Sequence, residues 1–342
     1  MAATAWLIVL GTYLEDGFFS RPGLLLITAA IVVSAGTLAA QRSSAVPAVP
    51  KRIWTAGLMA ALLVEIRLLV LSADASPRAS AAIAVVGALA LAQAMDLGRW
   101  RLRLFALAAI GFVMVAAAIS ITRDPQTDVF TFQQLGARAL IHGASPYAIR
   151  MPNLYPPTTP FYGPGVVDGA TNTLNIGLPY PPASLMLVLP GYLLAGDVRV
   201  ADAVAIALAA ALIVAARPSR WSGVAAAAFL LTPNVFFLVY SSWTEALMAL
   251  TFSAVMYCAL RRPTALPYAL GAFFATKQTS VLAAPLVWLL VDGPDRSRRY
   301  AILMAQAAGV AAVLTVPFFL WTPAAFWRSG APSGRRPASR WL

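Results

Sequence analysis

Charged residues are scarce in this chain of 342 residues. They make up 11% of it, while 60% of the residues are hydrophobic, whereas a soluble globular protein carries about a quarter charged residues. The polar residues are too few to cover a water-facing surface, which excludes soluble enzymes, disordered proteins and fibrous proteins. A mean hydropathy of +0.75 instead indicates an integral membrane protein with several spans.

Cysteine and histidine are almost absent, since Cys258 and His142 are the single examples of each. An intramolecular disulfide is therefore excluded, and a thiolate metal site or a Cys/His nucleophilic pair is not credible. The chain has no P-loop, no Gly-rich dinucleotide fingerprint and no His/Cys/carboxylate cluster. We expect no cofactor and no bound metal, although a lone carboxylate beside a phosphate can hold a divalent ion.

Acidic residues are outnumbered by basic ones, 13 to 25, which gives a net charge of +12. In a soluble protein this excess would suggest nucleic acid. Here the basic residues fall in short clusters between apolar runs, as the positive-inside rule requires of helical membrane proteins. Membrane lipids, not nucleic acid, are therefore the expected surroundings. High alanine and an excess of arginine over lysine suggest a bacterial inner (plasma) membrane.

The apolar runs predict an all-α fold, a polytopic transmembrane helical bundle with a large outer-face loop carrying amphipathic juxtamembrane helices. Four segments are expected: N-terminal transmembrane helices over 1–122, the outer-face loop and juxtamembrane helices over 123–199, a helical bundle over 200–321, and a disordered or frame-shifted tail over 322–342. Spans are expected at 23–40, 53–73, 80–97, 103–122, 200–216, 222–238, 244–260 and 301–321, with a helix on or in the outer leaflet at 183–196.

The apolar run 266–291 is unusual because Lys277 lies near its middle. One ordinary span would place a basic loop on the outer face and leave Lys277 in hydrocarbon, at a cost of about 3 kcal/mol. Two short helices that meet at Lys277 avoid both problems. A snorkelling lysine with no ligand is the alternative.

The outer-face loop contains the first candidate for chemistry, Asp128. Apolar residues at helical spacing predict an amphipathic helix over 128–141. Asp128 begins that helix, where an N-cap carboxylate is stabilised. Alternatively, the carboxylate accepts a proton from a hydroxyl nucleophile. Asp124 and Asp168 are competitors for that role.

Other polar and aromatic residues follow on the same face. Arg138, His142 and Arg150 fit either a bound phosphate or lipid head groups. Three tyrosines of the loop fit either anchoring at the interface or stacking on a sugar ring; they are Tyr155, Tyr162 and Tyr180. In the next outer loop, Glu245 either caps a helix or adds a second carboxylate beside Trp243, an aromatic of the kind that packs against carbohydrate.

Three stretches together resemble the GT-C superfamily of polytopic membrane glycosyltransferases. They are DVFTFQQLGARALIHGASPY (128–147), LPYPPASLMLVLP (178–190) and ATKQTSVLAAPL (275–286). The chain looks most similar to the bacterial branch of polyprenyl-phosphate-mannose-dependent mannosyltransferases. Members of this branch continue with further helices, so we expect this C-terminus to be truncated.

The resemblance implies transfer of a sugar, with inversion, from a polyprenyl-phosphate donor to a glycolipid or glycan acceptor on the outer face. Asp128 matches the catalytic aspartate that deprotonates the acceptor hydroxyl. Lys277, with Arg138, His142 and Arg150, matches positions that hold the donor phosphate. Glu245 matches a later acidic position, and Tyr147, Tyr180 and Trp243 would contact acceptor or sugar. The alternatives are a transporter or flippase of a lipid-linked or small solute, because broken helices with a central charge also mark transporters, and an inactive truncated remnant.

Overall fold

The computed structural model describes most of the chain from residue 21 onward. Its described residues are 7, 11, 21–42, 59–60, 63–64, 66–67, 77–95, 101–121, 125, 127–156, 161–163, 165–232 and 235–330. They form two compact units. The first contains Met1–Ile119 with Ile213–Leu238, and the second contains Ser120–Leu212 with Val239–Leu342.

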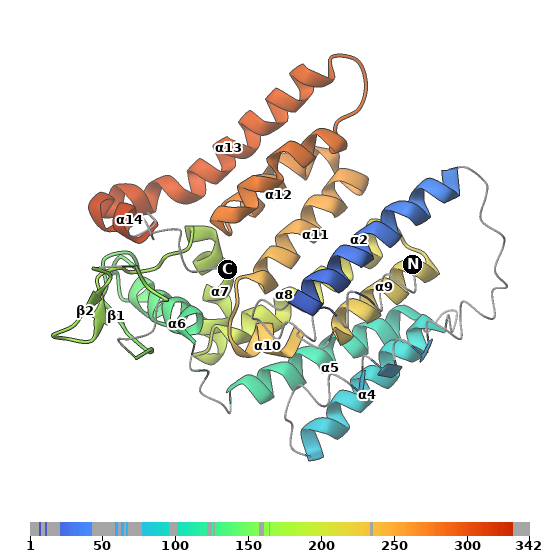
Figure 1. Ribbon diagram of the computed structural model, residues 1–342, viewed down its shortest axis with the longest axis horizontal. Helices are drawn as coiled ribbons and strands as arrows, with labels where there is room; N and C mark the ends of the chain where they lie inside the picture. The colour runs from blue at the N-terminus through green and yellow to red at the C-terminus, as the bar shows by residue number, and fades with distance from the viewer. Residues whose placement is uncertain are drawn as a thin grey trace. The chain divides into compact units, whose positions relative to one another are not determined.

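The first unit is built from apolar helices; its N-terminal part is drawn in blue to teal and α9 in yellow (Figure 1). Its helices are α2 (Arg21–Arg42), α4 (Pro77–Ala94), most of α5 (Arg101–Ile121) and α9 (Arg220–Leu231). A capping box between Ser219 and Ser222 begins α9, and α9 packs against α4. Phe112 of α5 is buried and packs edge to face on Phe236, with 5.5 Å between ring centroids.

The second unit contains every candidate site residue that the structure describes. Its elements, with two helices that cross the unit boundary, are α6 (Asp128–Ile141), β1 (Met151–Pro152), β2 (Val167–Asp168), β3 (Thr173–Leu174), α7 (Pro182–Ala195), α8 (Arg199–Ala216), α10 (Val235–Tyr240), α11 (Glu245–Arg261), η2 (Pro263–Ala265), α12 (Leu266–Phe274), η3 (Gln278–Leu290), α13 (Arg296–Trp321) and α14 (Pro323–Gly330).

Helix α6 packs its apolar face on α7 and on the loop between them. Phe132, Leu178 and Leu185 are buried together in this core. Gly136 permits the close approach, since a Cβ there would lie 3.3 Å from Leu185. The helix ends at Ile141, and Gly143, the residue after the C-cap His142, has a φ of +72° that suits glycine just past a helix C-terminus. The amphipathic helix predicted over 128–141 is therefore confirmed.

The run 266–291 folds as two short helices. Helix α12 ends at Phe274, Lys277 has extended backbone with φ −146° and ψ 142°, and the 3₁₀ helix η3 begins at Gln278. Gly271 packs on Val310, while Ala284 accepts a hydrogen bond from Tyr300 at 3.1 Å. Helix α12 therefore packs on the middle of α13, and η3 packs on the first turns of α13. The predicted break at Lys277 is confirmed.

Three expectations differ from the structure. The loop that was expected on the outer face contains a small antiparallel sheet of two-residue strands in the order β1-β3-β2, because backbone pairing satisfies its polar groups where prolines bar a helix. The expected single span 222–238 is divided between α9 and α10. Residues Pro323–Gly330 of the expected disordered tail form helix α14, which packs Phe326 on Tyr147 with 4.5 Å between ring centroids; 331–342 lie outside the described residues.

Within the described ranges, three helices are long and apolar enough to cross a membrane. They are Leu102–Ile121, Arg199–Ala216 and Arg296–Trp321. Shorter apolar helices include α7 and η3. This predominantly helical architecture with apolar helices of spanning length indicates association with a membrane.

Candidate functional site

Asp128 is the first residue of α6, and Thr127 is its N-cap. The N-cap interpretation of Asp128 is therefore wrong by one residue. The Thr127 side chain does not cap the helix; its Oγ1 donates a hydrogen bond to the Ser241 carbonyl at 3.2 Å. The positive end of the helix dipole still stabilises the negative charge of Asp128. Asp128 is not the N-cap, so its carboxylate is not required for capping the helix.

Two tyrosines form hydrogen bonds with Asp128. The Tyr162 hydroxyl donates to Asp128 Oδ2 at 2.9 Å, and the Asp128 backbone N–H donates to the Tyr155 hydroxyl at 3.5 Å. The two tyrosine rings lie 5.9 Å apart between centroids. Burial and the negative charge of Asp128 raise the pKa of both hydroxyls. Both hydroxyls therefore stay protonated, and Tyr162 remains a hydrogen-bond donor to the carboxylate.

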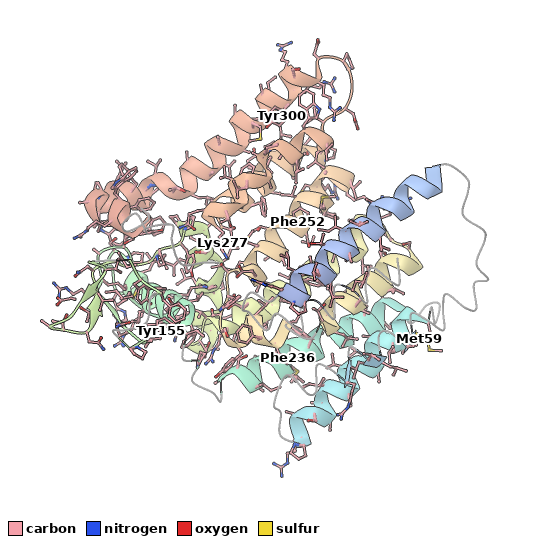
Figure 2. The ribbon with its side chains drawn as sticks, in the orientation of Figure 1. Met59, Tyr155, Phe236, Phe252, Lys277 and Tyr300 are labelled. Atoms are coloured by element: carbon pink, nitrogen blue, oxygen red, sulfur yellow. The ribbon has the colours of Figure 1, made fainter. Side chains whose placement is uncertain are left out.

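Glu245 and Lys277 form an ion pair between Glu245 Oε1 and Lys277 Nζ. Glu245 is the first residue of α11, after the N-cap Thr244. Lys277 lies at the break between α12 and η3 (Figure 2). The side chains are 40% and 22% exposed respectively, so both remain accessible to a ligand. Lys277 is thus not a snorkelling lysine without a partner.

The next residue, Gln278, is the first residue of η3 and fixes the junction between α12 and η3. Its side-chain amide donates to the carbonyl of Pro179. Two of the stretches singled out in the sequence, 178–190 and 275–286, therefore meet at this point.

Tyr180 is influenced by both carboxylates. Burial raises the pKa of the Tyr180 hydroxyl, and the negative charges of Asp128 and Glu245 raise it further. Buried Tyr147 donates to the Tyr180 carbonyl at 2.9 Å, and Phe132 packs edge to face on its ring. We call Asp128, Tyr162, Tyr180, Glu245 and Lys277 the carboxylate–lysine site.

The other predicted phosphate ligands lie elsewhere. Arg138 and His142 are exposed at the far end of α6, about 15–20 Å along the helix axis from Asp128, and His142 Nδ1 lies 2.8 Å from the Arg138 carbonyl. Arg150 pairs at 3.6 Å with Asp168, whose pKa is lowered chiefly by the Ala170 backbone N–H. The structure thus brings Lys277 to Glu245, while Arg138 and His142 lie away from both Asp128 and Glu245.

Of the remaining candidates, Trp243 is half-buried in the turn before α11, and Asp124 lies outside the described residues. The sequence reasoning missed a buried pair, in which Arg199 Nη2 lies 2.6 Å from Asp197 Oδ2 and the guanidinium covers Phe130 of α6 at 4.4 Å. The spacing Asp-x-Arg at the start of a predicted helix is the sequence signal that could have revealed this pair. This pair fastens the start of α8 to the first turn of α6, beside Asp128.

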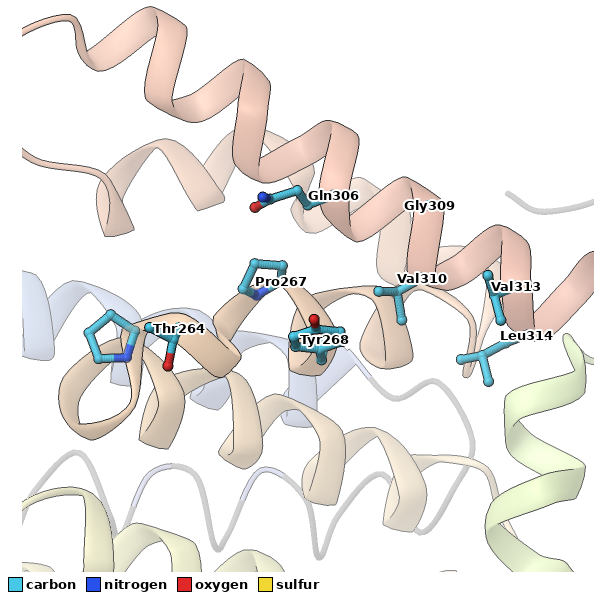
Figure 3. Close-up of a pocket in the computed structure, with 9 residues that line it drawn as sticks. Thr264, Pro267, Tyr268, Gln306, Gly309, Val310, Val313 and Leu314 are labelled. Atoms are coloured by element: carbon cyan, nitrogen blue, oxygen red, sulfur yellow. The ribbon is translucent and has the colours of Figure 1, made fainter.

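An apolar groove lies between α12 and α13, with a volume of about 690 Å³ (Figure 3). Tyr268 and Val310 face it from opposite sides, and Gln306 and Thr264 are polar groups at one end. Its shape and lining suit an extended apolar chain.

Within the described part of the chain, no group of three or more His, Cys, Asp or Glu side chains is placed to hold a metal ion. No protein family model, curated protein or solved structure matches the chain.

Proposed function

We propose that this protein is a membrane glycosyltransferase of the GT-C type. It transfers a sugar, mannose by the resemblance of its motifs, from a polyprenyl-phosphate donor to an acceptor hydroxyl on the outer face of a bacterial inner membrane. One observation carries the proposal: the four stretches that contain Asp128, Tyr180, Glu245 and Lys277 are joined by hydrogen bonds between their neighbours and by the Lys277–Glu245 ion pair. A carboxylate, a cation and aromatic rings are the groups that such a reaction uses.

Asp128 is the proposed general base. Tyr162 donates to Oδ2 and orients the carboxylate, so that Oδ1 faces the acceptor. This oxygen accepts the proton of the acceptor hydroxyl as the hydroxyl oxygen attacks the anomeric carbon. A new C–O bond forms on one face of the sugar while the bond to phosphate breaks on the other, so the configuration is inverted.

Lys277 is the proposed phosphate ligand. The leaving group is polyprenyl phosphate, and a phosphate needs no protonation to depart. The ammonium group stabilises the negative charge that develops on it. In the described conformation Lys277 is bound to Glu245, so the donor phosphate competes with Glu245 for this cation. Glu245 released in this way is a second carboxylate for sugar or acceptor hydroxyls.

The groove between α12 and α13 supports a lipid-linked donor. An isoprenoid chain is apolar and extended, and α12 leads directly from the groove at Tyr268 to Lys277. A soluble nucleotide sugar has no comparable use for an apolar groove.

Transport is the second candidate function. The re-entrant pair α12 and η3, with Lys277 at its tip, is the specific feature in its favour, because discontinuous helices with a central charge form substrate sites in transporters. A transporter releases its substrate chemically unchanged, whereas a transferase forms a new glycosidic bond.

The test is transfer from radiolabelled polyprenyl-phosphate mannose in membranes that contain the protein. Wild type, Lys277→Met and Asp168→Asn are compared at matched expression, with Asp168 as a surface carboxylate control. The proposal predicts a labelled glycoside of inverted configuration, about tenfold or more reduced in Lys277→Met and unchanged in Asp168→Asn. Label that crosses the membrane still attached to polyprenyl phosphate would support transport instead.

A further inference from the structure

A second polar cluster is buried behind the carboxylate–lysine site. It contains Gln133 of α6, Asp202 of α8, and Ser241 and Ser242 in the turn between α10 and α11, all fully buried. Gln133 Nε2 donates to the Ser242 carbonyl at 2.7 Å, and Ser242 Oγ donates to Asp202 Oδ2 at 2.7 Å. These two bonds bring three distant stretches of the chain together.

The cluster contains more acceptors than donors. Gln133 Oε1, Asp202 Oδ1 and Ser241 Oγ are each buried without a hydrogen-bond partner among the described residues. Each such atom carries a desolvation cost of about 1–3 kcal/mol, and more for a charged group. A buried carboxyl group therefore takes up a proton, pairs with a cation or coordinates a metal ion. The neighbouring ion pair of Asp197 with Arg199 carries no net charge of its own.

The backbone at this point is also unwound. The turn 241–244 separates α10 from α11, and Ser242 adopts φ +53°, which is uncommon for a residue other than glycine. Unwound backbone beside a buried carboxylate is the arrangement with which membrane proteins coordinate Na⁺ through oxygen atoms. One carboxylate balances one positive charge, which favours a monovalent over a divalent ion.

We propose that Asp202, Gln133 and Ser241 form a binding site for a monovalent metal cation, with Na⁺ as the best-suited ion. The cation satisfies the three free oxygens and holds the turn 241–244 against α6. Because Thr127 donates to the Ser241 carbonyl and Glu245 directly follows the turn, occupancy also fixes the positions of Asp128 and Glu245. The site is independent of the reaction proposed above, and its test requires no transferase activity.

The experiment measures binding to the purified full chain in detergent. Binding of ²²Na⁺ is measured by a scintillation proximity assay. Thermal unfolding is recorded in NaCl, KCl or choline chloride at constant ionic strength. The site predicts saturable ²²Na⁺ binding that unlabelled NaCl displaces and choline does not, with a higher Tm in NaCl than in choline. Displacement by KCl measures the preference between the two ions.

Three variants locate the site. Asp202→Asn keeps the shape of the side chain and removes its charge, so ²²Na⁺ binding and the Tm difference should be lost. Ser241→Ala removes one oxygen and should weaken affinity about tenfold while the protein stays folded. Asp168→Asn is the surface control and should bind as wild type does.

Some results would overturn the proposal. One is a Tm that does not depend on the cation, with no displaceable ²²Na⁺ binding, since a proton or a water molecule would then satisfy the cluster. Another is Na⁺ binding that Ser241→Ala and Asp202→Asn leave intact.

Discussion

Lys277 donates a hydrogen bond to Glu245 across the space between the tip of α12 and the start of α11. Each residue stands at the end of a helix, and neither is buried completely. The pair is therefore both a structural tie and a cation that a ligand can reach.

The stability of the ion pair is tested by a double-mutant cycle of Glu245→Gln and Lys277→Met. Because both side chains contact water, we expect a coupling of about 1 kcal/mol in the free energy of unfolding, and less at high salt. Denaturation in detergent at two salt concentrations measures it. A coupling near zero in low salt would mean that the pair does not hold α11 to the α12 tip.

Tyr162→Phe removes the hydroxyl that orients Asp128 and retains the ring. We expect transfer activity to fall about tenfold or more, because a misplaced base loses its alignment with the acceptor, and the fall should appear in kcat more than in KM. Tyr155→Phe is the comparison variant, since the Tyr155 hydroxyl also lies at Asp128 but receives a hydrogen bond of 3.5 Å from its backbone N–H. Equal losses in the two variants would contradict the assigned role of Tyr162.

The pKa of Tyr162 is raised by burial and by the charge of Asp128, which predicts a pH dependence of stability. Below about pH 10 the hydroxyl is protonated in both the folded and the unfolded chain, so its full contribution to the free energy of unfolding is present. Above that pH the unfolded chain ionises first, and the contribution is lost as the pH rises further. Tyrosinate absorbance and Tm across this range measure the effect. The Tm of Tyr162→Phe should fall less steeply with rising pH than the Tm of wild type. An identical fall in both proteins would contradict the raised pKa of Tyr162.

Two glycines near the groove give a matched test of packing. A Cβ on Gly271 would lie 2.5 Å from Val310 Cβ and 2.6 Å from the Ala307 carbonyl, whereas nothing lies within 4 Å of one on Gly309. Gly271→Ala should therefore destabilise the protein by about 1–3 kcal/mol. Gly309→Ala should be neutral or stabilise by up to about 1 kcal/mol. Equal unfolding free energies for the two variants would contradict the packing of α12 on α13.

Periodicity and charge placement predicted most local structure in the second unit. The apolar spacing predicted α6, and the basic loops on either side of 266–291 predicted the break at Lys277, because both signals are local in sequence. The N-cap was misplaced by one residue, since Thr127 and Asp128 are both acceptable there and a tertiary bond from Thr127 to Ser241 decides between them.

The grouping of site residues was less predictable. Arg138 and Asp128 lie on the same helix, and sequence proximity suggested a shared role, but ten residues of helix separate them by about 15 Å. Lys277 and Glu245 meet only through the packing of α11 on α12. The buried cluster around Asp202 gave no signal, because a single aspartate near a helix start is ordinarily explained by the helix dipole.

The most direct measurement is the rate of mannosyl transfer by Asp128→Asn relative to wild type, with Asp168→Asn as control and equal amounts of folded protein. The substitution keeps an oxygen for Tyr162 and removes the base. We predict a loss of about 10²–10⁴-fold for Asp128→Asn and no change for Asp168→Asn. A wild-type rate that survives in Asp128→Asn would contradict the assignment of Asp128 as the base and, with it, the proposed mechanism.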